Sequence, residues 1–337
     1  MRSDISPPQS SDVTTGHPTK QPKDGSQVVG NNSASGSGDK RERRSYDSDQ
    51  AAGLRRLLAR SSSRVVTVVG ARDGLGATSI VVNLAAVLGN SGKDVLVLDE
   101  NLSQDNVANT LALKARFDLL HVVHGDKTLQ DVLVQGSRGV HVLPVARAIQ
   151  GLSKLDEAQR GRLLESLSAA AKDMDVVLVD AARAGHSVCA SLSGDEPLLL
   201  VLNATASGIT ESYALLKQMA MHNGRQAFDI VVNKVGSERE ALAIFDNMAQ
   251  VANRHLRVHL EYLGHIPVDE KLKRATQLGR PVTEAFPAAQ SSYAMREIAQ
   301  GLLRAPMVSD EGHDVLGSVM QRLMRQTRPA NNTMAIT

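Results

Sequence analysis

The sequence predicts a doubly wound α/β fold in which a mostly parallel sheet is flanked by helices. Short apolar runs rich in Val and Leu recur along the chain, and such runs suit parallel strands that are buried on both faces. Helical segments separate these runs, and repeated βα units imply right-handed crossovers with ligands at the carboxyl ends of the strands. The expected strands span residues 65–69, 95–98, 140–143, 176–179, 198–202, 228–232 and 258–263, and the expected helices include residues 77–90, 153–172, 210–222 and 237–254.

Four regions are expected along the chain. Residues 1–45 are rich in Ser, Gly, Pro, Asn and Asp and contain almost no large apolar side chains. Burial cannot offset the entropy lost on ordering such a segment, so we expect a disordered tail. Residues 46–60 have the apolar spacing and capping residues of a short helix. Residues 61–304 are expected to form the α/β domain, and residues 305–337 an amphipathic helix and a tail.

The C-terminal region is predicted to contain a basic amphipathic helix over residues 314–328. An apolar stripe on this helix lies beside several arginines. Helices of this kind lie in membrane interfaces, and the alternative is a helix packed on the protein's own surface or on a partner. The stripe residues assigned to membrane contact are Leu316, Met320, Leu323 and Met324.

The composition argues against several classes of function. Aromatic residues are scarce (Phe 4, Tyr 4, Trp 0), which disfavours a platform that stacks single-stranded nucleic-acid bases. The single cysteine, Cys189, excludes an intramolecular disulfide and fits a reducing cytoplasm. No apolar run approaches the roughly 20 residues that a membrane span needs, so we expect a cytoplasmic protein with at most peripheral contact at the inner face of the membrane. The pairs His121/His124 and His255/His259 lack a suitably placed Cys or carboxylate, so we expect no metal site there.

A glycine-rich loop, GARDGLGATS over residues 70–79, follows the first expected strand and precedes a helix. Such a loop presents backbone N–H groups and the positive end of the helix dipole to an anion. A complete phosphate loop reads G-x-x-x-x-G-K-[ST], with the Lys on the β and γ phosphates and the hydroxyl on the magnesium ion. Here Gly74, Gly76 and Thr78 remain, but Ala77 stands where that Lys belongs. The loop therefore either retains weak nucleotide binding or serves only to turn the chain.

Four further segments resemble the MinD/ParA-like deviant-Walker ATPases. VLDENLSQDN (97–106) resembles the first switch of that family, and VVLVDAARAG (176–185) resembles the second. VVNKV (231–235) and HIPVDEKLKRATQLGRPV (265–282) resemble the segments that enclose the adenine. The resemblance implies a phosphate-loop NTPase fold and ATP or ADP with magnesium as the cofactor.

Within this superfamily the chain most resembles FlhG/FleN-type regulators of flagellar number and placement. The helix DQAAGLRRLL (49–58) resembles the motif by which these regulators engage the signal-recognition GTPase FlhF, and residues 209–217 and 233–248 add to the match. The resemblance spans residues 47–304. It implies FlhF and flagellar basal-body components as partners, and it raises a homodimer as a further expectation. The partner-binding residues that it implies are Gln50, Leu54, Arg55, Arg56 and Leu57.

The resemblance also shows where the loop departs from the family pattern. The signature Lys of the family falls at Arg72, the next Gly at Asp73 and the phosphate-loop Lys at Ala77. Arg72 keeps a positive charge that can reach a phosphate across a dimer, although its guanidinium fork is not equivalent to an ammonium. Asp73 places a carboxylate where phosphates would approach.

Other family roles are carried over residue by residue. Asp99 corresponds to the switch carboxylate that positions the attacking water, and Asp180 to the carboxylate near magnesium, which Thr78 also contacts. Ala181 stands where the second switch has Thr, and the spacing to Gly185 is one residue longer than usual. Asn233 would read the adenine. The implied nucleotide-binding residues are Arg72, Gly74, Gly76, Thr78, Ser79, Asn233, Lys234, Pro267 and Asp269.

These features predict a regulator of flagellar number or placement that acts as a nucleotide-switch binding protein on FlhF, with weak or absent ATP hydrolysis. One alternative is an active MinD-like ATPase that uses Arg72 in place of the usual lysines. Another is a ParA-like DNA-partition protein. That activity needs a basic face on the folded domain, whereas the only dense basic run lies at residues 40–44.

Overall fold

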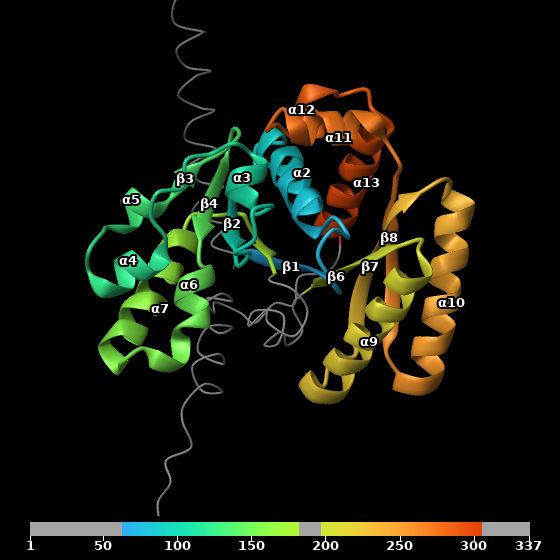
Figure 1. The fold of residues 1–337 in the computed structure, drawn as a ribbon, viewed down its shortest axis with the longest axis horizontal. Helices are drawn as coiled ribbons and strands as arrows, with labels where there is room; N and C mark the ends of the chain where they lie inside the picture. Colours follow the sequence, from blue (N-terminus) through green and yellow to red (C-terminus); the bar gives the residue numbers. More distant parts are fainter. Residues whose placement is uncertain (1–62, 182–196, 305–337) are drawn as a thin grey trace, which may run out of the picture. The chain divides into compact units, whose positions relative to one another are not determined.

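The computed structural model describes residues 63–181 and 197–304. The predicted tail, the partner-binding helix and the C-terminal helix, with all their assigned residues, lie outside the described residues. The described residues form an eight-stranded sheet of order β3-β4-β2-β5-β1-β6-β7-β8 (Figure 1). Every neighbouring pair is parallel except β3 and β4, which confirms the predicted doubly wound α/β fold.

The strands agree with the seven expected apolar runs, and one short strand adds to them. Their bounds are β1 Arg64–Gly70, β2 Val95–Asp99, β3 Val134–Gln135, β4 Val140–Pro144, β5 Val176–Asp180, β6 Leu198–Asn203, β7 Ala227–Val235 and β8 His259–Pro267. β1, β2, β5 and β6 are buried along their whole length. Strands covered on both faces read as continuous apolar runs, which is why the sequence revealed them. β3 was missed because two residues carry no period.

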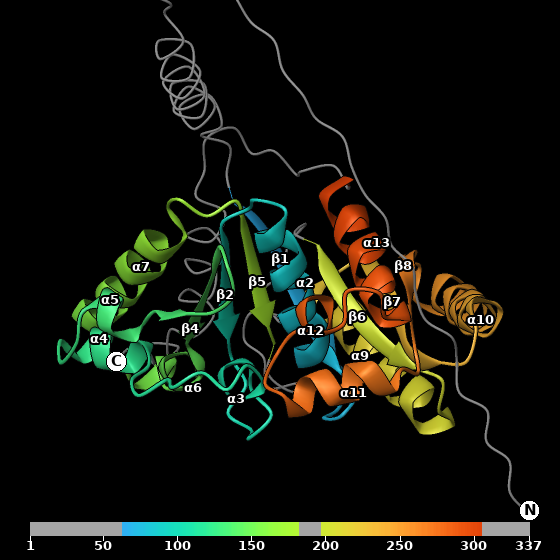
Figure 2. The same ribbon diagram turned by 90° about the horizontal axis from the view of Figure 1, so that it is seen from above.

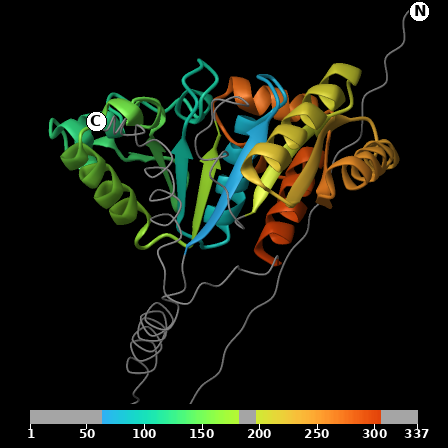
Figure 3. The same ribbon diagram turned by 90° about the horizontal axis from the view of Figure 1, so that it is seen from below.

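Helices cover both faces of the sheet. Their bounds are α2 Ala77–Asn90, α3 Val107–Thr110, α4 Leu119–His124, α5 Leu129–Val132, α6 Ala146–Gln150, the 3-10 helix η1 Leu152–Lys154, α7 Glu157–Ala171, α9 Ala206–Asn223, α10 Glu238–Leu256, α11 Glu270–Gln277, α12 Val282–Ala285 and α13 Gln290–Arg304. Figures 2 and 3 view the domain from opposite sides, with α2 and α13 in front of the sheet in the first and α9 in front in the second.

The two faces of the sheet bury different sets of side chains. Alternate residues of β1 point to opposite faces, so Val66 and Val68 pack with α2 and α13, whereas Val65 packs with α4–α7. A third cluster joins β6–β8 to α9 and α10. All seven parallel strands therefore end at one edge of a sheet that is covered on both faces, which is where an open α/β sheet binds its ligand.

The expected helices match in position, and their ends follow capping residues. α2 begins and ends where the sequence predicted. The helix expected from residue 153 begins instead at Glu157, because Asp156 and Gln159 form a capping box there. α9 begins before its expected start at residue 210, because the Thr205 side chain accepts a hydrogen bond from the Gly208 N–H.

Candidate functional site

The glycine-rich loop joins β1 to α2 at the carboxyl edge of the sheet. Gly74 and Gly76 have φ angles of 79° and 99°, a backbone region that favours glycine. A Cβ atom on Gly76 would lie 2.3 Å from the Asn233 side-chain nitrogen, so close packing also requires glycine there. The loop thus keeps the backbone shape that directs N–H groups toward an anion at the start of α2.

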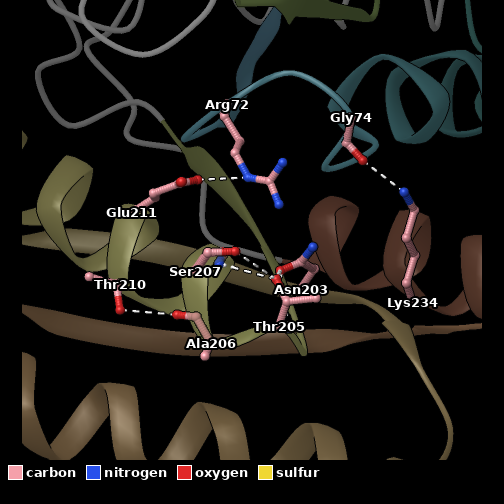
Figure 4. Close-up of polar contacts among 10 residues, drawn as sticks. Arg72, Gly74, Asn203, Thr205, Ala206, Ser207, Thr210, Glu211 and Lys234 are labelled. Atoms are coloured by element: carbon pink, nitrogen blue, oxygen red, sulfur yellow. Dashed lines mark hydrogen bonds and ion pairs between the residues drawn. The ribbon is translucent and has the colours of Figure 1, made fainter.

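Two neighbouring residues at the end of β7 hold this loop. The Asn233 amide donates to the Leu75 carbonyl at 2.7 Å, and the Lys234 ammonium donates to the Gly74 carbonyl at 2.7 Å. Figure 4 shows Lys234 reaching Gly74 across the edge of the sheet. The adenine contact assigned to Asn233 stays a prediction, and the structure gives its buried amide a contact with the loop.

A hydroxyl and a carboxylate meet behind the loop. The Thr78 hydroxyl donates to Asp180 Oδ2 at 2.8 Å, while Asp180 Oδ1 is buried and makes no hydrogen bond to any residue that the structure describes. Burial, together with the nearby charge of Asp99, raises the pKa of Asp180 well above its usual value. An unpartnered buried carboxylate oxygen is costly unless a cation or donor meets it.

These oxygen atoms fit a magnesium ion. Mg²⁺ prefers oxygen ligands and is commonly held by one or two carboxylates plus the phosphates of a bound nucleotide. The described residues contain no cluster of three His, Cys, Asp or Glu side chains arranged to hold a metal alone. The site therefore suits a metal that arrives with phosphates, with Thr78 and Asp180 as the protein groups beside it.

Asp99 organises the segment that follows β2. Its Oδ1 accepts the Asn101 N–H and its Oδ2 accepts the Val107 N–H, both at 3.0 Å. Burial raises the pKa of Asp99 to about 6, although these backbone hydrogen bonds act in the opposite direction. The water-positioning role assigned to Asp99 stays a prediction, because both of its oxygens hold the loop backbone here.

Asn101 is a site residue that the sequence reasoning did not identify. Its amide nitrogen lies 3.3 Å from the Thr78 hydroxyl, so it is the residue after β2 whose side chain reaches the Thr78–Asp180 pair. The available signal was its position two residues beyond a strand-terminal aspartate. An uncharged side chain at such a position attracts less notice than a carboxylate.

Arg72 forms an ion pair with Glu211 of α9. The guanidinium Nε lies 2.7 Å from Glu211 Oε2, and both side chains are about two-fifths exposed (Figure 4). α9 is capped by Thr205, whose hydroxyl donates to Asn203 Oδ1 at 2.8 Å. Glu211 was missed as a charge partner because nothing in the sequence relates two residues so far apart. The charge assigned to phosphate contact is thus balanced within the chain.

The remaining assigned residues lie along the same edge. Pro267 ends β8, and Asp269 accepts hydrogen bonds from the Lys271 N–H and the Ser291 hydroxyl, both at 2.8 Å. These hydrogen bonds outweigh burial and lower the pKa of Asp269. Ser79 lies in the first turn of α2, where its carbonyl accepts from Asn83. The second switch beyond Ala181 falls outside the described residues.

Comparison with known proteins identifies related sequences. Residues 66–282 match the family model described as the CobQ/CobB/MinD/ParA nucleotide binding domain. The chain is 34% identical to the antiactivator FleN of Pseudomonas aeruginosa, over 74% of this chain and 90% of that protein. It is 25% identical to the flagellum site-determining protein YlxH of Helicobacter pylori, over 72% of this chain and 83% of that protein.

Solved structures are similar in fold. The septum site-determining protein MinD of Pyrococcus horikoshii, complexed with Mg-ADP, has a TM-score of 0.55 at 24% identity and covers 72% of this chain and 96% of its own. The cell division ATPase MinD of Pyrococcus furiosus has a TM-score of 0.57 at 23% identity and covers 72% of this chain and 100% of its own. In the part of the chain that is described, no helix is long and apolar enough to cross a membrane.

Proposed function

We propose that this protein regulates the number or placement of flagella as a nucleotide-dependent binding protein. The chain belongs to the CobQ/CobB/MinD/ParA nucleotide-binding family and to the FleN/FlhG type within it. Two relatives support the flagellar role, since one is named an antiactivator and another a flagellum site-determining protein. The observation that carries the nucleotide part is the Thr78–Asp180 pair beside a loop that keeps Gly74 and Gly76.

The proposed ligand is ADP or ATP with magnesium. The N–H groups of the loop and the first turn of α2 would hold the phosphates, while Thr78 and Asp180 would lie beside the metal. When bound, the metal would supply a positive charge beside Asp180, whose Oδ1 has no hydrogen-bond partner among the described residues. A MinD of the same fold complexed with Mg-ADP supports this choice of ligand.

Weak or absent hydrolysis is part of the proposal. Ala77 begins α2 without the ammonium that normally reaches the β and γ phosphates, and Arg72 is paired with Glu211. Both oxygens of Asp99 hold backbone N–H groups. The alternative of an active ATPase requires Arg72 to leave Glu211 and turn toward the phosphates.

The proposed partner is an FlhF-type GTPase, engaged through residues 49–58. Leu54 and Leu57 would supply apolar anchors, and Arg55 and Arg56 would reach the partner. An arginine offered to a GTP site stabilises charge that develops on the transferring phosphoryl group. Peripheral membrane contact through residues 314–328 and dimer formation belong to the same proposal. Residues 49–58 and residues 314–328 both lie outside the described residues, so the sequence alone supports the partner and membrane contacts.

A fluorescent-nucleotide titration tests the proposed ligand. Binding of mant-ADP should require magnesium, and Asp180→Asn should abolish the difference between magnesium and EDTA because it removes the carboxylate beside Thr78. Asp126→Asn, an exposed substitution on a distant turn, is the matched control. Equal binding with and without magnesium in the unsubstituted chain would contradict the proposal.

Deleting residues 49–58 should remove stimulation of FlhF GTP hydrolysis and leave mant-ADP binding intact.

A further inference from the structure

Lys234 adopts a backbone conformation that lysine rarely takes. Its φ angle is +59°, in the left-handed region that costs a residue with a Cβ atom free energy. Two other described non-glycine residues have positive φ. One of them, Arg257, follows the end of α10, where this conformation commonly terminates helices. Lys234 instead lies within the last residues of β7.

The strand pairing is irregular at the same residue. Asn233 lies opposite Ile266 of β8 and Val235 opposite Pro267, so Lys234 is an additional residue between two paired positions. A bulge of this kind re-aims a side chain at the end of a strand. Here it sends the lysine side chain toward the glycine loop rather than into the β7–β8 ladder.

The outcome is a two-point attachment of the loop, which we call the β7 clamp. Asn233 holds the Leu75 carbonyl and Lys234 holds the Gly74 carbonyl, each at 2.7 Å. The two clamp residues also support each other, because the Lys234 N–H donates to Asn233 Oδ1 at 2.9 Å. Two consecutive carbonyls are thereby turned toward β7.

This attachment leaves the donors of the loop available. The N–H groups of residues 73–76 make no hydrogen bond to another described residue. A peptide whose carbonyl is held on one side presents its N–H on the other, and successive N–H groups in a glycine-rich turn form an anion site. The left-handed backbone at Lys234 thus occurs together with the hydrogen bond from the Lys234 ammonium to the Gly74 carbonyl, which helps to set the shape of the candidate phosphate site.

We propose that Lys234 is a positioning residue for nucleotide binding: through the β7 clamp it holds the phosphate loop in its anion-binding shape, in a loop that lacks the lysine expected at position 77. The proposal rests on the proposed binding of Mg-nucleotide. Lys234 acts through the Gly74 carbonyl, and its backbone strain is retained because the clamp requires the bulge.

Backbone order in the nucleotide-free protein, measured by 15N NMR relaxation, tests the clamp. Lys234→Met should lower the order parameters of residues 71–77 from about 0.85 to below about 0.6, because the loop moves more freely once one attachment is lost. Lys234→Arg keeps a cationic donor and should restore the high order parameters. Lys172→Met, an exposed charge loss at the end of α7, is the matched control and should leave the loop unchanged. Unchanged order parameters of residues 71–77 in Lys234→Met would overturn the clamp.

A stability comparison separates the positioning role from a merely structural one. Lys234→Gly and Lys234→Met both lose the ammonium, but only glycine relieves the positive φ. The glycine variant should therefore melt about 2–4 °C above the methionine variant. Both should bind mant-ADP with magnesium about ten-fold more weakly than the unsubstituted chain, and Lys234→Arg should recover most of the affinity.

The two proposals can fail separately. If both variants bind mant-ADP as tightly as the unsubstituted chain, Lys234 does not position the nucleotide and the inference is wrong. If the unsubstituted chain binds no mant-ADP while the loop order parameters still respond to Lys234→Met, the clamp stands as a structural device. That outcome overturns both the nucleotide-positioning role and the proposed nucleotide function.

Discussion

The candidate site has two halves that differ in how much chemistry they retain. The metal half, formed by Thr78, Asp180 and Asn101, keeps its oxygen donors, and Asp180 Oδ1 has no hydrogen-bond partner among the described residues. The cation half has alanine at position 77, and Arg72, the basic residue within the loop, is paired with Glu211. The comparison teaches that the fold and the buried Thr78–Asp180 contact coexist with a glycine-rich loop that contains no lysine.

The largest expected effect concerns Asp99, a buried carboxylate that lies opposite Asp180 on the neighbouring strand. Burial raises the pKa of Asp99 to about 6 from an ordinary value of 3.8, so the folded chain binds a proton more tightly than the unfolded chain. This contribution to stability is full below pH 4 and is lost as the pH rises through about 6. We expect the loss of this contribution to lower the free energy of unfolding by about 3 kcal/mol.

Urea unfolding between pH 4 and 7 measures this loss. Asp99→Asn should flatten the profile because the substituted side chain does not titrate. Burial also raises the pKa of Asp229 to about 6, so Asp229→Asn serves as the comparison. It should remove the part of the pH dependence of the free energy of unfolding that arises from Asp229. A profile that keeps its full slope in Asp99→Asn would show that Asp99 is not the source of the pH dependence.

The next effect concerns the cation half. Ala77→Lys should tighten mant-ATP binding about thirty-fold, because a charged hydrogen bond to phosphate in a sheltered site is worth about 2 kcal/mol. Titration with magnesium measures the change. Ala115→Lys, at an exposed position before α4, adds the same charge elsewhere and should not alter affinity. If the two variants bind alike, the residue at position 77 does not limit the affinity of the site for nucleotide.

The smallest effect concerns the Arg72–Glu211 pair. Glu211→Gln should free Arg72 and tighten mant-ATP binding about three-fold, since exposed ion pairs contribute at most about 1 kcal/mol. Stability should change by less than about 1 kcal/mol for the same reason. Glu165→Gln, an exposed residue of α7, is the control. Weaker binding in Glu211→Gln would mean that Glu211 supports the nucleotide rather than competing with it.

The local patterns predicted most of the architecture. The buried strands were visible because continuous Val and Leu runs occur where both faces are covered, and α2 was delimited at both ends. The helices α3, α5 and α12 have four residues each, which is too short for apolar periodicity to appear. At the site, the sequence identified the loop and Asp180. It identified neither Asn101, which is uncharged, nor Glu211, which lies far from Arg72 along the chain.

By itself the sequence determined the βα order, the retained Thr78 and the loss of the lysine at position 77, because each depends on residues close together in the chain. Only the tertiary structure decided which side chains meet. Arg72 faces Glu211, and Lys234 reaches Gly74, because the sheet brings the ends of distant strands to one edge. Charge pairing and loop attachment depend on distances in space, and no local pattern encodes those distances.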